Sequence, residues 1–189
     1  LAALAERIEA LEAARGLERG AIRVVPTVES AAGLMRVPEL ATAPRIAAFA
    51  FGATDFAADL GAEPGPDERE TLLARSWLVL ASRAAGVGAP IASVHTKLDD
   101  EEGLRRTTME ARRLGFWGRS CIHPKQLAIV HEVFTPTADQ IADARAVLEA
   151  FQQQVAAGQA SFRLGDRFVD RAVAARAARL LARVERPLA

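Results

Sequence analysis

The chain alternates short apolar runs with longer segments in which apolar residues recur at helical spacing. The apolar runs cover residues 22–28, 46–52, 90–95 and 116–122. The helical patterns that accompany them cover residues 1–16, 30–40, 68–85 and 101–114, and the pattern over 30–40 is interrupted near Pro38. Each apolar run is short and apolar on both faces, which is typical of strands buried in a parallel sheet. The pattern therefore predicts an α/β fold in which a parallel sheet is connected by helical crossovers.

After Pro136 the pattern changes, because no further apolar run follows a helix. A long helical pattern over 138–157 ends at Gly158, and a compact segment over 162–170 leads into a last helix over 172–184. Four β/α units make half of a closed (β/α)8 barrel. We therefore expect residues 1–136 to form the second half of a TIM barrel and residues 137–189 to form a C-terminal helical extension. An open four-stranded sheet is the alternative.

The chain begins at Leu1 inside a helical pattern and has no initiator Met. We therefore expect the numbering to start partway through a longer protein, in which an N-terminal half would supply the other strands of the barrel. Lys plus Arg equals Asp plus Glu, at 24 each, among the 189 residues. This balance indicates neither a nucleic-acid nor a membrane partner, and no apolar run is long enough to cross a bilayer. The single cysteine cannot form an intrachain disulfide, which favours a cytoplasmic location.

Two of the predicted strands are followed by an acidic residue, Glu29 after the first and Asp55 after the second. In an α/β barrel the carboxyl ends of neighbouring strands meet on the face that carries the active site. Two carboxylates on that face suit a hard cation such as Mg²⁺, which prefers oxygen ligands and keeps positions open for substrate. From the residues alone, an equally good interpretation is that Glu29 caps a helix and Asp55 bonds to a loop backbone.

Six segments in order closely resemble the HpcH/HpaI aldolase and citrate lyase beta-subunit family. They are VVPTVESAAGL, FAFGATDFAADLG, LASRAAGVGAPI, DDEEGL, RLGFWGRSCIHPKQ and VFTPTADQIADA. The resemblance extends from Leu1 to about Val184. It implies a TIM barrel with a C-terminal helical extension, and homo-oligomers that are trimers or multiples of trimers. It also implies an enzyme that cleaves or forms carbon–carbon bonds.

The resemblance implies that Glu29 and Asp55 are the two Mg²⁺ ligands. A 2-oxo acid would chelate the same ion through its carboxylate and keto oxygens, so two protein ligands are enough. The small residues that precede Asp55 would let backbone amides approach the substrate carboxylate closely. The substrate-binding residues that we expect are therefore Glu29, Ala53, Thr54 and Asp55. Many relatives carry an acid where Thr54 stands.

The segment from Asp166 to Asp170 resembles the C-terminal signature of the CoA-dependent members. The resemblance implies that Asp170 is a catalytic acid/base that enters the active site of an adjacent subunit. Asp166 and Phe168 depart from the usual Gly and Met, so the local turn is expected to differ. Asp170 is also well placed to be the N-cap of the last helix, and the two roles are compatible.

The family's substrate-binding arginine comes from an earlier barrel strand, and no residue of this chain is assigned to it. Arg36, Arg75 and Arg83 are expected to be ordinary arginines on helix surfaces. The resemblance implies a Mg²⁺-dependent carbon–carbon lyase that acts on a 3-hydroxyacyl-CoA such as malyl-, citramalyl- or citryl-CoA. Its partners would be the CoA thioester and a 2-oxo acid. The alternatives are an aldolase of the same superfamily that acts without CoA, and an accessory citrate lyase beta-type subunit that is inactive without partner subunits.

Overall fold

The computed structural model describes residues 1–185, and it divides into two compact units. The first unit ends at Phe134 and the second begins at Thr135. Within the described residues, no helix is long and apolar enough to span a membrane.

The first unit contains a four-stranded sheet in which every strand is parallel to its neighbours. The strands are β1 (Thr27–Val28), β2 (Ala50–Phe51), β3 (Ile91–Ala92) and β4 (Gly118–Arg119), paired in that order. Each strand is shorter than the apolar run that predicted it, although a further parallel bridge joins Val24 and Ile46. The predicted α/β fold with a parallel sheet is confirmed.

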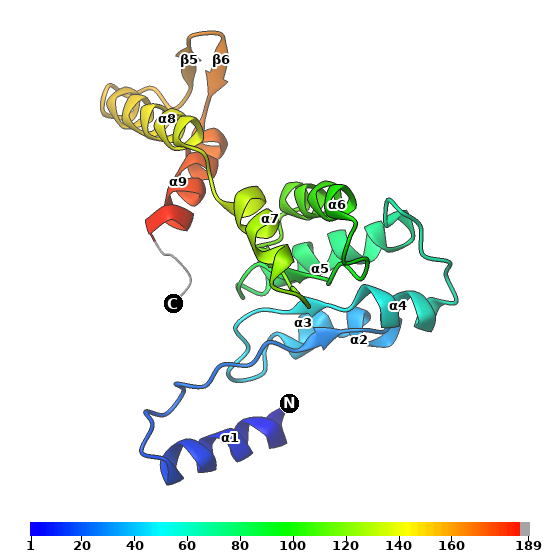
Figure 1. Ribbon diagram of the computed structural model, residues 1–189. Helices are drawn as coiled ribbons and strands as arrows, with labels where there is room; N and C mark the ends of the chain where they lie inside the picture. The colour runs from blue at the N-terminus through cyan, green and yellow to red at the C-terminus, as the bar shows by residue number, and fades with distance from the viewer. Residues whose placement is uncertain (186–189) are drawn as a thin grey trace. The chain divides into compact units, whose positions relative to one another are not determined.

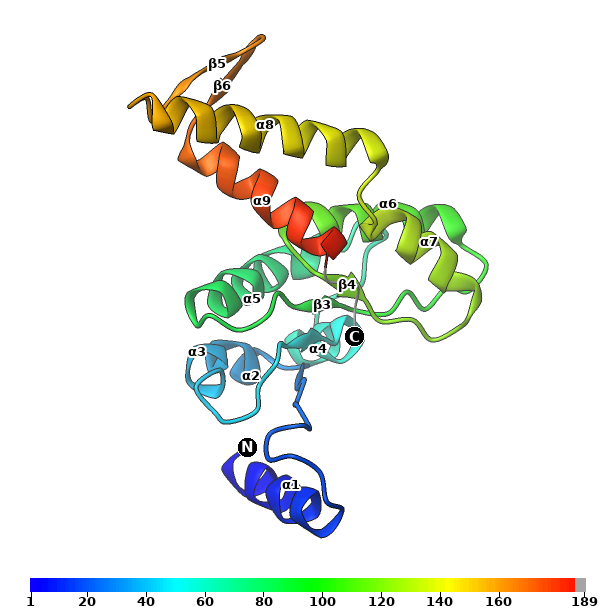
Figure 2. The same ribbon diagram turned by 90° about the vertical axis from the view of Figure 1, so that its left-hand side faces the viewer.

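Helices connect the strands and form a row in which α3, α5, α6 and α7 each contact the next (Figures 1 and 2). The helices of the first unit are α1 (Ala2–Ala14), α2 (Ala31–Met35), α3 (Val37–Leu40), α4 (Ala53–Leu60), α5 (Leu72–Ala84), α6 (Glu101–Leu114) and α7 (Lys125–Phe134). The interruption predicted near Pro38 is confirmed, because the segment over 30–40 forms two short helices. They meet at Arg36, two residues before Pro38, which lies in the first turn of α3.

The helix predicted over 68–85 begins later than expected. A 3-10 turn, η1 (Arg69–Thr71), precedes α5, and Glu68 adopts a left-handed conformation with φ 53°. Asp67, which precedes Glu68, pairs with Arg69 of this 3-10 turn. The prediction for α6 was accurate at both ends, because the Asp100 side chain accepts a hydrogen bond from Gly103 N and Gly115 ends the helix at φ 109°.

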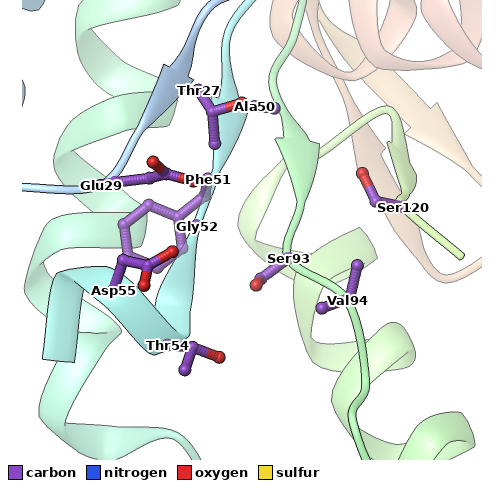
Figure 3. A pocket seen from close by; sticks show the side chains of 10 residues that line it. All are labelled: Thr27, Glu29, Ala50, Phe51, Gly52, Thr54, Asp55, Ser93, Val94 and Ser120. Carbon is purple, nitrogen blue, oxygen red and sulfur yellow. The ribbon is translucent and has the colours of Figure 1, made fainter. Parts of the chain in front are cut away.

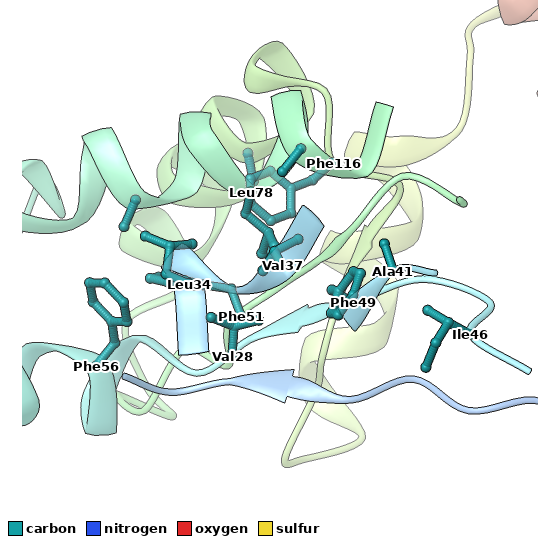
Figure 4. Packing of buried hydrophobic residues seen from close by; sticks show 14 residues of the cluster. Val28, Leu34, Val37, Ala41, Ile46, Phe49, Phe51, Phe56, Leu78 and Phe116 are labelled. Carbon is teal, nitrogen blue, oxygen red and sulfur yellow. The ribbon is translucent and has the colours of Figure 1, made fainter. Parts of the chain in front are cut away.

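The hydrophobic core of the first unit lies between the sheet and the helices (Figure 4). Phe49 and Phe51 from the second strand region pack with Leu78 of α5 and with Phe116, which precedes β4. Each of these large side chains is almost completely buried, and each such burial contributes about 2 kcal/mol to folding. This packing holds the carboxyl ends of the strands in place.

The second unit is a pair of helices joined by an antiparallel hairpin. Helices α8 (Ala138–Ala156) and α9 (Arg171–Glu185) pack along each other, and the hairpin strands are β5 (Phe162–Leu164) and β6 (Arg167–Val169) (Figure 2). Thr137 and Gln140 form a capping box at the start of α8. Val147 and Val169 are buried in the core of this unit, and Gly165 takes a left-handed conformation in the hairpin turn.

Candidate functional site

A pocket of about 230 Å³ lies where the four parallel strands end (Figure 3). Its lining residues come from all four strand regions and from the start of α4. They are Thr27, Glu29, Ala50, Phe51, Gly52, Thr54, Asp55, Ser93, Val94 and Ser120. No lysine or arginine of the described residues belongs to this lining, so the two carboxylates have no such cationic side chain beside them in the pocket.

Glu29 and Asp55 come together in this pocket because the strands that precede them are neighbours. Glu29 directly follows β1, and Asp55 lies in the first turn of α4, which follows β2. Val28 and Phe51 are register partners, so the two strands end at the same level. Asp55 therefore lies at the start of a helix, where a loop was expected. Among the described residues, neither carboxylate has a hydrogen bond or an ion pair.

Gly52 makes room for the Glu29 side chain. A Cβ atom at position 52 would lie 2.5 Å from Glu29 Cγ and 2.8 Å from Glu29 Oε1. Both distances are shorter than non-bonded atoms tolerate. Only glycine at this position is therefore compatible with the observed place of Glu29.

The first turn of α4 borders the pocket, because Thr54 and Asp55 belong to its lining. The first N–H groups of a helix have no partner within the helix, and the helix dipole makes this end favourable for anions. Ala53 N donates a hydrogen bond to Ser93 Oγ over 3.0 Å. In the described part of the chain, the amides of Thr54 and Asp55 have no acceptor. They are available to an anionic oxygen in the pocket.

Ser93 and Ser120 line the opposite wall, and neither was among the site residues expected from the sequence (Figure 3). Ser93 directly follows β3 and Ser120 directly follows β4, just as Glu29 directly follows β1. This shared position after a strand is the signal that could have identified them. A serine after a buried strand is common, however, and gives no chemical hint by itself.

The donor set of the pocket fits a divalent cation with oxygen ligands. Two carboxylates face the same space, and no positive side chain of the described residues competes for them there. Within the described residues, no group of three or more His, Cys, Asp or Glu side chains could hold a metal ion. Two protein ligands would leave most positions of an octahedral Mg²⁺ ion to water and to substrate oxygens.

Asp170 belongs to the second unit, where it follows β6 and begins α9. Its Oδ1 accepts a hydrogen bond from Val173 N over 2.9 Å, which is the capping contact expected for an N-cap residue. Its Oδ2 has no partner among residues 1–184. Phe168, two residues earlier on β6, is 66% exposed.

Of the three arginines predicted to lie on helix surfaces, Arg75 is buried, so the prediction is wrong for this residue. Arg36 and Arg83 are exposed, but Arg75 is only 2% exposed and contacts the carboxylates of Glu68 and Glu110. Arg119 is also buried, and its Nη1 donates to the Ser93 carbonyl oxygen over 2.9 Å. Removal of the Arg119 guanidinium from water is the main cause that lowers its pKa.

Residues 1–124 match the family described as HpcH/HpaI aldolase/citrate lyase. A citrate lyase subunit beta-like protein of Deinococcus radiodurans is 38% identical over 158 residues, which cover 84% of this chain and 55% of that protein. The mitochondrial citramalyl-CoA lyase of Mus musculus is 35% identical, and the match covers 79% of this chain and 46% of that protein. The chain thus spans about half the length of the curated relatives it matches.

The fold is also similar to that of a solved structure with bound ligands. The crystal structure of protein CitE from Mycobacterium tuberculosis, in complex with magnesium, acetoacetate and coenzyme A, superimposes with a TM-score of 0.73. The two chains are 29% identical, and the match covers 87% of this chain and 61% of that one.

Proposed function

The chain belongs to the HpcH/HpaI aldolase/citrate lyase family, and on that premise we propose that it is part of a Mg²⁺-dependent carbon–carbon lyase. The substrate would be a 3-hydroxyacyl-CoA such as malyl-, citramalyl- or citryl-CoA, which is cleaved to a 2-oxo acid and an acyl-CoA or formed from them. The observation that carries the proposal is the pair of carboxylates, Glu29 and Asp55, that share one pocket without any protein partner among the described residues.

In this proposal Glu29 and Asp55 hold Mg²⁺. The chemistry that Mg²⁺ supplies when bound is polarisation of a keto group and stabilisation of negative charge on its oxygen. Glu29 keeps its place because Gly52 leaves space for it, and Asp55 is fixed by the first turn of α4. Both side chains are acidic and face one pocket, which supports their assignment as ligands. Citrate lyase beta-type neighbours have been crystallised with magnesium, which supports it further.

The amides at the start of α4 would bind the carboxylate of the 2-oxo acid. The N–H groups of Thr54 and Asp55 are without acceptors in the described part of the chain, and the helix dipole favours a negative charge there. The Ala53 amide already donates to Ser93 Oγ, so it would contact the substrate only by sharing this hydrogen bond. Ala53, Thr54 and Asp55 are therefore proposed to orient the substrate.

Asp170 is proposed to move the proton at the acyl-CoA carbon in the active site of an adjacent subunit. In cleavage it would protonate the enolate of the acyl-CoA, and in condensation it would remove the proton from the same carbon. The contact between its Oδ1 and Val173 N orients the carboxyl group and leaves Oδ2 for the proton transfer. The signature segment that ends at Asp170 supports this role.

The architecture that goes with this function is also part of the proposal. Residues 1–136 would form the second half of a (β/α)8 barrel, and residues 137–189 would form an extension that carries Asp170 to a neighbour in a cytoplasmic trimer or a multiple of trimers. The parallel four-stranded sheet and the covered share of the relatives support the barrel half.

The test is to assay the purified chain with malyl-, citramalyl- and citryl-CoA, each with and without Mg²⁺. The expected result is Mg²⁺-dependent release of a 2-oxo acid from at least one of the thioesters. Asp170→Asn should keep Mg²⁺ and 2-oxo acid binding but lose turnover. Cleavage of free hydroxy-oxo acids with no cleavage of thioesters would instead indicate the CoA-independent aldolase. Turnover that appears only after citrate lyase partner subunits are added would indicate the accessory subunit.

A further inference from the structure

We propose that Ser93 is a further substrate-binding residue of the pocket, whose hydroxyl donates a hydrogen bond to a carboxylate oxygen of the bound 2-oxo acid. The inference rests on the proposed function and extends it, because it adds a side-chain donor from the third strand region to the residues proposed to bind the substrate. It is supported by the hydrogen bonds of Ser93, by the neighbouring amides of α4 and by the buried arginine behind the serine.

The Ser93 hydroxyl has an unused proton at the pocket. Ser93 is 8% exposed, lines the pocket and points across it toward the start of α4 (Figure 3). Its Oγ accepts from Ala53 N over 3.0 Å. A hydroxyl that accepts one hydrogen bond still carries one O–H to donate. No atom of the described residues accepts that proton, so a ligand oxygen in the pocket is the natural acceptor.

Three donors meet at this corner of the pocket. They are the Ser93 hydroxyl and the amides of Thr54 and Asp55, which have no acceptors within residues 1–184. Each of these groups has a proton left to donate, and a carboxylate, whose two oxygens only accept, can take hydrogen bonds from several such donors. This argues for the carboxylate of the 2-oxo acid as the acceptor and against a group that would itself need an acceptor there.

Arg119 fixes the Ser93 backbone from behind and is a positioning residue. Its Nη1 donates to Ser93 O over 2.9 Å, and its Nη2 lies 3.9 Å from Glu68 Oε1. The same Glu68 carboxylate lies 3.1 Å from Arg75 Nη1. Burying a charged group costs free energy unless it is paired. The Glu68 carboxylate offsets that cost for both arginines, and it does so from a left-handed backbone conformation. This arrangement locks the main chain of Ser93 at the pocket wall.

The experiment compares Ser93→Ala with the rescue variant Ser93→Thr and the control Ser82→Ala. Ser82 is a buried serine of α5 whose hydroxyl has no hydrogen-bond partner in the described part of the chain, and it is not among the residues that line the pocket. Isothermal titration calorimetry measures Mg²⁺ binding first, and then pyruvate and oxaloacetate binding at saturating Mg²⁺. Thermal unfolding shows whether each variant is folded.

We expect Ser93→Ala to weaken binding of the 2-oxo acids about tenfold, the effect of one lost hydrogen bond to a charged group, while the Kd for Mg²⁺ changes less than about twofold. Ser93→Thr keeps the hydroxyl and should bind within about threefold of wild type. Ser82→Ala should bind like wild type. Arg119→Lys should weaken 2-oxo acid binding more than Mg²⁺ binding. The substitution disturbs the Ser93 backbone and leaves the carboxylates of Glu29 and Asp55 in place.

Three results would overturn the inference, and they are distinguishable. If wild type binds the 2-oxo acids with Mg²⁺ and Ser93→Ala binds them equally well, the assignment of Ser93 is wrong and the proposed function stands. If wild type binds Mg²⁺ but none of the 2-oxo acids, the proposed function fails, and the role of Ser93 fails with it. If Ser93→Ala does not fold, the test moves to Arg119→Lys and Ser93→Thr. If each of these variants loses Mg²⁺ binding and 2-oxo acid binding to the same extent, the role of Ser93 is purely structural.

Discussion

Glu12 and Glu29 are the same residue type in two opposite surroundings. Glu12, in the last turns of α1, is 1% exposed, and its carboxylate accepts hydrogen bonds from Arg45, Gly20 N and Ile22 N. Glu29 lies at the pocket, exposed and without a partner among the described residues. A carboxylate whose oxygens are all occupied by the protein is part of the scaffold. One that the fold leaves unoccupied at a pocket is available to a ligand.

The backbone around each glutamate is adapted to its surroundings. Near Glu12, Arg45 and Gly20 both adopt positive φ values, 72° and 90°, and each donates to the Glu12 carboxylate. Near Glu29, Gly52 has no side chain where a Cβ would collide. At Glu12, residues with positive φ values surround the carboxylate. At Glu29, a glycine leaves the space that the carboxylate occupies at the pocket. Substitution of Glu29 should therefore reduce ligand binding and leave stability unchanged. Substitution of Glu12 should reduce stability and leave ligand binding unchanged.

Removing either charge at the pocket should abolish most turnover. Glu29→Gln and Asp55→Asn each lose a ligand of the proposed Mg²⁺ site, and the expected loss in kcat/KM is about a thousandfold or more, since metal stabilisation of the transition state is worth several kcal/mol. The unfolding temperature should not fall, because neither acid has a partner to lose among the described residues. Glu63→Gln, which alters an acid away from the pocket lining, is the matched control. Full turnover in both pocket variants would disprove the ligand assignment.

Filling the space beside Glu29 should weaken metal binding without changing any charge. The Cβ added by Gly52→Ala would displace the Glu29 side chain. We expect the Kd for Mg²⁺ to rise about 10- to 100-fold, the range seen when the support of a metal ligand is lost. The control is Gly118→Ala on β4, where an added Cβ meets no atom of the described residues within 4 Å. Equal Mg²⁺ affinity in the two variants would show that the position of Glu29 does not matter.

Removing the charge of Glu12 should have the reverse outcome. Glu12→Gln leaves the largely buried Arg45 guanidinium without its anionic partner, so the unfolding temperature should fall clearly. Mg²⁺ affinity should stay at the wild-type value. Glu9→Gln is the matched control, because Glu9 lies on the same helix and pairs with Arg19 at the surface, where an ion pair contributes little. If Glu12→Gln lost Mg²⁺ affinity and kept the wild-type unfolding temperature, Glu12 would not be the structural residue that this comparison requires.

The ion pair between Glu12 and Arg45 should also make a smaller contribution to the pH dependence of the free energy of unfolding. Hydrogen bonds from the Arg45 side chain and the Ile22 backbone lower the pKa of Glu12 from 4.5 to about 2. Because the folded-state pKa is the lower one, this stabilisation is fully present above about pH 4.5 and is lost as the pH falls toward 2. Urea unfolding of wild type and Glu12→Gln between about pH 6 and the acid range, at about half-unit steps, measures the difference. The difference between the two proteins should shrink on acidification, and parallel curves would contradict the assignment.

Local signals in the sequence were sufficient where the residues that decide an element lie within a few positions of it. Helix α6 begins and ends where predicted, because Asp100 caps it and Gly115 ends it. Helix α8 likewise begins after Thr137 and ends just before Gly158. Where distant residues decide, the local pattern was misleading. The helix predicted to begin at Glu68 does not begin there, because the Glu68 carboxylate reaches Arg75 and Arg119 from a left-handed backbone.

The candidate site divides in the same way. That an acid follows each of the first two strands is visible in the sequence, and so is the possibility of a metal between them. The burial of Arg75 could not be predicted, since an arginine within an amphipathic pattern gives no indication of partners that lie on other elements. Ser93 was missed because its role depends on the amide of Ala53, which is 40 positions away in the chain.

The sequence by itself determined the alternation of strands and helices, the ends of the best-capped helices, and the location of Glu29 and Asp55 just after two buried strands. The tertiary structure alone decided that β1 and β2 are neighbours in register, that both acids lie in one pocket without protein partners among the described residues, and that Ser93 and the α4 amides meet there. The physical reason is the range of the interactions. Caps, turns and apolar periodicity act through a few residues of backbone, whereas strand pairing, burial and the surroundings of a carboxylate are set by segments that only packing brings together.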